Sequence, residues 1–237
     1  MKNHVPNAIT LLNLFFGCCA IASLFYGKFE TAFYFITCAV IADFADGLVA
    51  RMLNVSSPMG KELDSLADMV SFGVVPGVIY YMLLLVAWDK LDSSVLYPAA
   101  LPGFILSLFS ALRLAKFNLD ERQTDGFLGL PTPSSTIFAA GLMLIYDKNS
   151  LGLGHLVATP GFLYSCIAVL CFLLVSEIPM FSLKLKRFEW KGNEIKFIFA
   201  AIAVVLLLLV KEAAFATIIF LYAAFSSLRF LLKPKSL

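Results

Sequence analysis

Charged residues are scarce in this chain of 237 residues: Asp, Glu, Lys and Arg make up 14% of it, whereas 60% is hydrophobic. A typical soluble domain has about 25% charged residues, so these charges are too few to cover a soluble surface. A net charge of +2, without a basic tract interleaved with aromatics, also argues against nucleic acid as a partner. The composition therefore predicts an integral membrane protein whose surroundings are the lipid bilayer.

Histidine and cysteine offer no pattern that would bind a metal or supply a nucleophile. His4 and His155 are isolated, and the five cysteines lie in apolar runs without a CxxC pair. Such cysteines are typically small apolar residues packed between helices. No internal repeat, low-complexity tract or separate soluble stretch divides the sequence, so residues 1–237 are predicted to form a single membrane domain.

Apolar runs that approach or exceed the length of a membrane span, about 17–25 residues, recur along the whole chain. They predict an all-α polytopic membrane protein with about eight transmembrane helices. The expected spans are residues 7–26, 31–52, 62–87, 95–115, 132–147, 158–176, 194–210 and 213–232. Only Lys211 and Glu212 separate the last two spans, which predicts either a tight hairpin or a smaller number of helices.

The lysines and arginines predict the orientation, because cytoplasmic loops of membrane proteins carry an excess of both. If the N-terminus is cytoplasmic, only Lys28, Lys90, Lys148 and Lys211 of the 18 basic residues face the other side. The sequence therefore predicts a protein of the plasma membrane, or bacterial inner membrane, with both termini and the active site on the cytoplasmic side.

Four acidic residues stand out in the second and third predicted spans. Asp43 and Asp46 share a helix face by their spacing, and so do Asp64 and Asp68 on the next, antiparallel helix. From a helical rise of about 1.5 Å per residue, Asp46 should lie level with Asp64, and Asp43 with Asp68, just below the cytoplasmic rim. Four carboxylates are therefore expected to converge.

Carboxylates at this depth repel one another and are costly to place, so they need a compensating partner. Hard divalent cations with oxygen ligands meet that need, and Mg²⁺ or Mn²⁺ suits phosphate chemistry. Gly47, Ala50 and Gly60 leave room beside the acids for a bulky ligand such as a nucleotide. The alternatives are a polar network without metal, and a cation or solute carrier. Carriers, however, tend to place their sites near the bilayer midplane.

The spacing of these residues resembles the signature of the CDP-alcohol phosphatidyltransferase family, D-x2-D-G-x2-A-R-x8-G-x3-D-x3-D. The fixed positions are all matched, at Asp43, Asp46, Gly47, Ala50, Arg51, Gly60, Asp64 and Asp68. The resemblance implies that the four aspartates hold two metal ions, Mg²⁺ or Mn²⁺, and that Asp68 is also the catalytic base. It further implies a transferase fold whose donor substrate is a CDP-activated lipid such as CDP-diacylglycerol.

The same resemblance implies which residues contact the CDP moiety. They are Asn7 and Thr10 in the opening segment, then Asp43, Gly47, Ala50, Arg51, Ser57 and Gly60. By the resemblance, the opening segment closes over the nucleotide; from the residues alone, Asn7 and Thr10 could merely start a helix, so that alternative stays open.

Members of the family differ in the alcohol that accepts the phosphatidyl group. Residues 64–76, 113–118, 127–133 and 176–184 resemble the membrane-embedded phosphatidylserine synthases, a subgroup that uses L-serine. A serine carboxylate needs a cation or N–H donors, for which Arg113, Lys116, Asn118 and Lys184 are the candidates, with membrane anchoring as the alternative role of the basic residues. Glycerol phosphate and inositol remain alternative acceptors. The sequence leaves the oligomeric state open, with a homodimer among the options.

Overall fold

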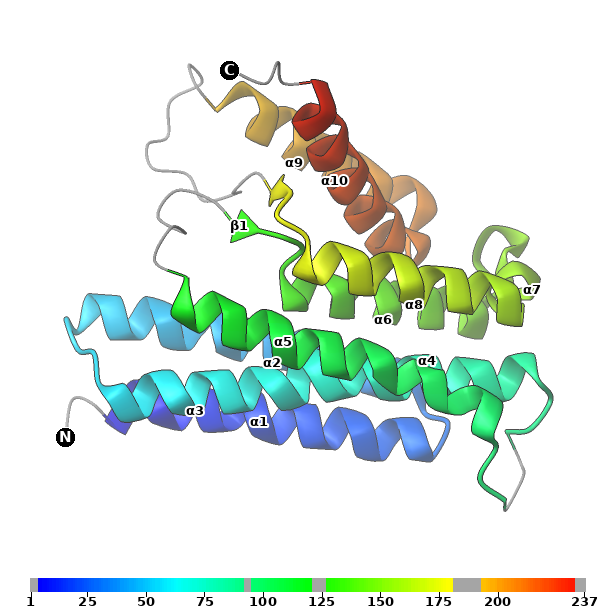
Figure 1. Cartoon of the computed structure of the whole chain (residues 1–237), viewed down its shortest axis with the longest axis horizontal. Coiled ribbons are helices and arrows are strands. Elements are labelled where there is room, and N and C mark those ends of the chain that lie inside the picture. The colour runs from blue at the N-terminus through cyan, green and yellow to red at the C-terminus, as the bar shows by residue number, and fades with distance from the viewer. Residues whose placement is uncertain (1–3, 92–94, 121–126, 181–192, 233–237) are drawn as a thin grey trace.

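The protein is a bundle of long helices, described here by a computed structural model over residues 4–91, 95–120, 127–180 and 193–232 (Figure 1). Each predicted span coincides with a helix in this part of the chain. The helices are α1 (His4–Phe25), α2 (Phe29–Met52), α3 (Pro58–Asp68), α4 (Val75–Ala87), α5 (Ile105–Leu119), α6 (Thr132–Lys148), α8 (Pro160–Val175), α9 (Glu194–Val210) and α10 (Ala213–Leu232). The predicted all-α polytopic architecture is therefore confirmed.

The third predicted span consists of three joined elements. A π-helical turn, η1 (Met69–Val74), connects α3 to α4, so that one helical segment runs from Pro58 to Ala87. In the described part of the chain, five segments are long and apolar enough to cross a membrane: α1, α2, Pro58–Ala87, Pro98–Leu119 and α10. The helices α6, α8 and α9 are shorter, with 17, 16 and 17 residues.

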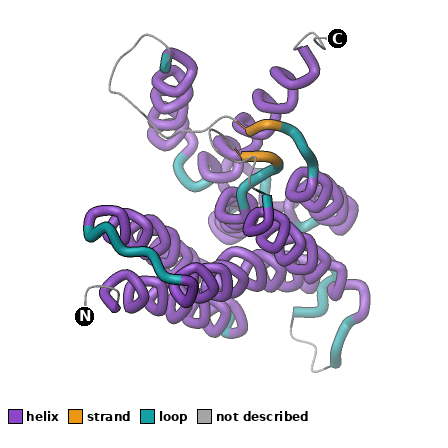
Figure 2. The backbone as a smooth tube through the Cα atoms, turned by 60° about the vertical axis from the view of Figure 1, so that its left-hand side comes forward, coloured by secondary structure: helices purple, strands orange, loops and turns teal. Residues whose placement is uncertain are grey.

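Short elements join the helices. The 3₁₀ turn η2 (Pro98–Phe104) leads into α5, and η3 (Ser150–Gly152) and the one-turn α7 (Gly154–Val157) lie between α6 and α8. Two short strands, β1 (Phe127–Leu128) and β2 (Pro179–Met180), pair antiparallel and tie the segment before α6 to the segment after α8 (Figure 2). Helices α9 and α10 follow each other with only Lys211 and Glu212 between them, as the hairpin alternative predicts.

Helix α4 forms the centre of the bundle. Its residues Ile79, Tyr80, Leu83 and Leu84 are fully buried, and the helix contacts α1, α5, α6 and α8. Because η1 joins α4 to the helix that carries Asp64 and Asp68, those side chains are attached to the buried centre of the bundle.

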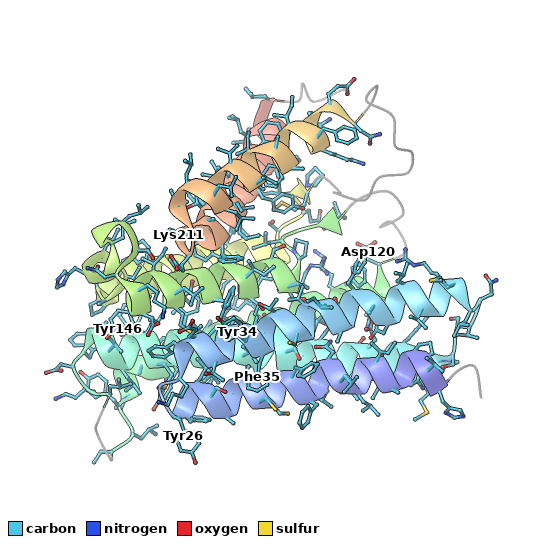
Figure 3. All side chains as sticks on the ribbon, turned by 180° about the vertical axis from the view of Figure 1, so that it is seen from behind. Tyr26, Tyr34, Phe35, Asp120, Tyr146 and Lys211 are labelled. Carbon is cyan, nitrogen blue, oxygen red and sulfur yellow. The ribbon has the colours of Figure 1, made fainter. Side chains whose placement is uncertain are left out.

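The two ends of the bundle have different chemistry. At one end Trp88 Nε1 donates a hydrogen bond of 3.2 Å to the Tyr164 hydroxyl, which donates one of 2.6 Å to Ala99 O. Tyr26 and Tyr146 lie at the same end of the bundle, away from Asp120 (Figure 3). Tryptophan and tyrosine are enriched where membrane meets water, so this end is consistent with a membrane interface. The α2–α3 loop and the acidic residues near it belong to the other end.

Candidate active site

The start of α3 fixes the register of the acidic residues. Ser57 is the N-cap residue in an extended conformation, its side chain accepts a hydrogen bond of 3.0 Å from Gly60 N, and Pro58 is the first helical residue. Serine at the N-cap and proline at the first position are both strongly preferred at helix starts. A helix that begins at Pro58 places Asp64 and Asp68 on one face, and this helix packs against α1.

Three of the four predicted metal ligands meet in a cluster. Asp43 from α2 and Asp64 and Asp68 from α3 each offer a carboxylate oxygen, and these atoms lie within 4.8 Å of one another. Among the described lysines and arginines, none forms an ion pair with these carboxylates. Three hard oxygen donors without a cationic partner fit a divalent ion such as Mg²⁺ or Mn²⁺.

Asp46 lies beside this cluster but outside the group of three. Its carboxylate accepts a hydrogen bond of 2.6 Å from the Thr10 hydroxyl, and the residue is buried. Asp46 and Asp64 line one pocket together, whereas Asp43 and Asp68 lie in the acidic cluster behind it. Asp64 therefore belongs to both.

The pocket opens between the first turns of α1, the end of α2 and the start of α3. Its lining comes from these helices and the α2–α3 loop: Pro6, Asn7, Thr10, Asp46, Gly47, Ala50, Val55, Ser56, Ser57, Gly60, Lys61 and Asp64. The pocket wall at Gly47 has no side chain, and a Cβ atom added there would meet no described atom within 4 Å beyond the nearby backbone of its own helix. A ligand can thus approach the backbone of α2 directly.

Comparison with known proteins agrees with this geometry. A family model described as CDP-alcohol phosphatidyltransferase matches residues 3–175. The chain belongs to the CDP-alcohol phosphatidyltransferase family. The match contains the acidic helices and the pocket, and it ends at the last residue of α8, before α9 and α10.

Three curated proteins similar to this transferase share the printed name CDP-diacylglycerol–serine O-phosphatidyltransferase. The protein of that name from Bacillus subtilis is 36% identical over 152 residues, which cover 64% of this chain and 82% of the relative. The Helicobacter pylori (strain ATCC 700392 / 26695) protein is 31% identical over 192 residues, covering 78% and 74%. The Saccharomyces cerevisiae protein is 35% identical over 179 residues, covering 65% and 60%.

The residues predicted to contact CDP fall into two groups, those that line the pocket and those that lie outside its lining. Asn7, Thr10, Gly47, Ala50, Ser57 and Gly60 all line the pocket of this transferase. Asp43 lies in the acidic cluster instead, outside the pocket lining. The exposed Arg51 turns back along its own helix, where its Nε donates a hydrogen bond of 2.9 Å to Gly47 O.

The three described candidates for a serine site, Arg113, Lys116 and Asn118, lie on α5, and none of these three lines the pocket. Asn118 donates a hydrogen bond of 2.8 Å to Ser65 Oγ, and Lys116 lies 3.5 Å from both Val175 O and the Glu177 carboxylate. Arg113 is buried with only 4% of its surface exposed. Lys184 falls outside the described residues.

Lys116 forms an ion pair with Glu177, whereas Arg113 forms none with an acidic residue in the described part of the chain. The Arg113 guanidinium lies 5.0 Å from the centre of the Phe117 ring, and its Nε has no hydrogen-bond acceptor among the described residues. Isolated buried charges are expensive, so such groups usually have an anionic partner.

One residue of the site was not identified from the sequence. Asn13 of α1 is fully buried, and its side-chain Nδ2 donates a hydrogen bond of 3.3 Å to the Asp68 carboxylate. The signal was present in the spacing, because Asn7, Thr10 and Asn13 follow one another at three-residue intervals and therefore share one face of a helix. Polar side chains in such a row on an otherwise apolar span indicate a buried polar partner.

Proposed function

We propose that the protein transfers the phosphatidyl group of CDP-diacylglycerol to the hydroxyl of L-serine, giving phosphatidylserine and CMP. The observation that supports this most strongly is the acidic cluster of Asp43, Asp64 and Asp68 behind a pocket with a bare glycine wall, in a chain of this family. The names of the curated relatives support serine as the acceptor.

In the proposed reaction, the serine hydroxyl oxygen forms a bond to the phosphorus of the phosphatidyl group as the bond to the CMP oxygen breaks. Asp68 takes the hydroxyl proton, and CMP leaves with the electron pair of the broken bond. Asp43, Asp46, Asp64 and Asp68 are the residues that would hold Mg²⁺ or Mn²⁺, with two ions expected. When bound there, the metal supplies positive charge that offsets the negative charge of the diphosphate.

Asn7, Thr10, Gly47, Ala50, Ser57 and Gly60 are proposed to bind the CDP moiety, since they line the pocket. Asp43 and Arg51 belong to the same proposal although they lie outside the lining. The contact with Gly47 O uses only Nε of Arg51, so the other N–H groups of this exposed guanidinium are available to a phosphate. Arg113 is proposed to bind the serine carboxylate, with Lys116, Asn118 and Lys184 as further candidates.

The Gly47→Ala variant is expected to bind CDP-diacylglycerol less well without losing stability. The added methyl meets no atom of the protein within 4 Å, and alanine favours a helix by about 1 kcal/mol over glycine. The methyl does occupy the pocket wall, so the Michaelis constant for the CDP lipid should rise about tenfold, a binding loss of about 1.4 kcal/mol.

The matched control for this variant is Gly161→Ala in α8, where an added Cβ also meets nothing within 4 Å. Steady-state kinetics and unfolding temperature in detergent are measured for both. Gly161→Ala should leave the kinetics unchanged. Equal Michaelis constants in Gly47→Ala and wild type would remove Gly47 from the nucleotide site.

The proposal places the active site and both termini on the cytoplasmic side of the plasma membrane or bacterial inner membrane. Single cysteines replacing Glu62 and Lys90, near the two ends of the Pro58–Ala87 segment, test this in a variant that lacks the five native cysteines. A thiol reagent that cannot cross membranes should label the Lys90 position in intact cells and the Glu62 position only after lysis. The reverse labelling pattern would show that the protein has the opposite orientation in the membrane.

Two further expectations remain part of the proposal. Residues 176–237, which lie outside the family match, are assigned to the same membrane domain because α10 packs along α6. A second copy of the chain is the proposed protein partner, as a homodimer.

The acceptor is tested with purified protein, CDP-diacylglycerol and separate reactions that contain L-serine, glycerol 3-phosphate or inositol. Release of CMP should require L-serine and should be accompanied by an equal amount of phosphatidylserine. If glycerol 3-phosphate or inositol supports faster CMP release than serine, the assignment of serine as the acceptor is wrong, although the family membership stands. No release with any alcohol would contradict the transferase proposal itself.

A further inference from the structure

The helix that carries Asp68 changes its geometry directly after that residue. The π-helical turn η1 begins at Met69, and such turns are found frequently at functional sites. Pro76 has no N–H, so Phe72 O loses the donor that an α-helix would supply. The Thr136 hydroxyl lies 3.2 Å from Phe72 O and can donate to it, sharing its proton with Thr132 O at 3.1 Å. From α5, the Ser107 hydroxyl donates to Gly73 O at 2.8 Å. Neighbouring helices thus hold the turn in place.

Asn13 of α1 contacts this junction from a third side, with two different groups. Its side-chain Nδ2 donates to Asp68 Oδ1 at 3.3 Å, and its backbone O accepts a hydrogen bond of 3.0 Å from the Ser71 hydroxyl. The two contacts lie within one turn, immediately before and within η1. Gly17 allows this approach, because a Cβ at that position would overlap the Ser71 hydroxyl and lie 3.1 Å from Ser71 Cα.

The contact between the Asn13 amide and the Asp68 carboxylate pairs a hydrogen-bond donor with an acceptor. Asp43 and Asp64 lie next to Asp68, with carboxylate oxygens within 4.8 Å of one another, and ionised carboxylates this close repel one another. An ionised carboxylate can only accept hydrogen bonds, and the Asn13 amide offers it an N–H donor. Asn13 itself is fully buried and does not line the nucleotide pocket.

We infer that Asn13 is a positioning residue: its amide holds the Asp68 carboxylate in the acidic cluster, in the orientation needed for proton removal and cation binding. This inference rests on the proposed function, because it assigns a role relative to the base of that reaction. Its effect should fall on turnover and on metal binding, not on binding of the CDP lipid.

The test uses Asn13→Leu, which keeps a similar shape and the backbone contact with Ser71 but removes the donor, together with the smaller Asn13→Ala. Ser23→Ala is the control, because among the described residues Ser23 Oγ bonds only to Cys19 O, one turn earlier in its own helix. We expect kcat to fall about tenfold, which corresponds to about 1.4 kcal/mol, while the Michaelis constant for CDP-diacylglycerol changes by less than about twofold. The Mn²⁺ dissociation constant, measured by electron paramagnetic resonance on purified protein, should rise in both Asn13 variants and stay unchanged in Ser23→Ala.

A second comparison separates positioning from a general structural role. In an Asp68→Asn background, Asn13→Leu should cause no further change in the Mn²⁺ dissociation constant, because the group that Asn13 holds is no longer a carboxylate. An equal increase in both backgrounds would overturn the inference, as would wild-type kcat and Mn²⁺ affinity in Asn13→Leu. If the wild-type protein makes no phosphatidylserine, by contrast, the proposed function is wrong, but the role of Asn13 in metal binding can still be tested through the Mn²⁺ dissociation constant.

Discussion

Asp64→Asn is expected to abolish phosphatidyl transfer while the protein remains folded. Among the four acidic residues of the motif, Asp64 is the one that belongs both to the acidic cluster and to the pocket lining. The change removes a negative charge from a cluster of like charges, so the folded state loses little. A metal site that loses a carboxylate ligand loses several kcal/mol of charge stabilisation, which amounts to more than about a hundredfold in rate.

The measurement compares CMP release by wild type, Asp64→Asn and Glu62→Gln. Glu62 is an exposed acid two positions before Asp64 on the same helix, so the change at Glu62 should leave the rate unaffected. Wild-type activity should also disappear in excess chelator and return when Mg²⁺ or Mn²⁺ is added. Full activity in excess chelator would contradict a metal-dependent reaction, and an active Asp64→Asn would remove that residue from the metal site.

Arg113→Ala is expected to raise the Michaelis constant for serine about tenfold to a hundredfold, with little change for CDP-diacylglycerol. A charge-assisted hydrogen bond contributes about 1.5–3 kcal/mol, which corresponds to that range in affinity. The side chain is buried and its Nε lacks an acceptor among the described residues, so a free carboxylate is a suitable partner. No described acidic residue forms an ion pair with Arg113, so the change leaves no buried carboxylate without its partner.

Arg113→Met separates the charge from the packing, because methionine keeps an apolar stem of similar length beside Phe117. Both Arg113 variants should show the same increase in the Michaelis constant for serine. Lys116→Ala should show a smaller increase, because Lys116 pairs with Glu177 near the end of α5. An unchanged serine constant in both Arg113 variants, with a large effect of Lys184→Ala, would move the carboxylate site to the segment after α8.

The helices and the acidic motif could be predicted because they depend on local sequence. Apolar runs of sufficient length define the spans, and the four-residue interval between Asp64 and Asp68 places both on one helix face. The boundaries were less accurate where a single residue sets them. The apolar pattern predicts a third span from residue 62, but the Ser57 cap and Pro58 start α3 four residues earlier.

Features that depend on contacts between helices could not be read from the sequence in the same way. The orientation of Asp46 follows from Thr10, which is 36 positions away in the chain. The π-helical turn after Asp68 depends on hydroxyls of α5 and α6, and the position of Asn13 against Asp68 depends on how closely α1 approaches at Gly17. The motif spacing also does not predict side-chain direction: Arg51, a motif residue predicted to bind CDP, lies along its own helix with its Nε on Gly47 O.

The most direct test of the account uses L-serine whose hydroxyl oxygen carries a heavy isotope, with unlabelled CDP-diacylglycerol and purified protein. Attack of the serine hydroxyl on the phosphatidyl phosphorus keeps that oxygen in the new ester bond. Mass spectrometry should therefore find the heavy oxygen in phosphatidylserine, and CMP should carry none. Labelled CMP, or a phosphatidylserine product without the label, would contradict the proposed transfer.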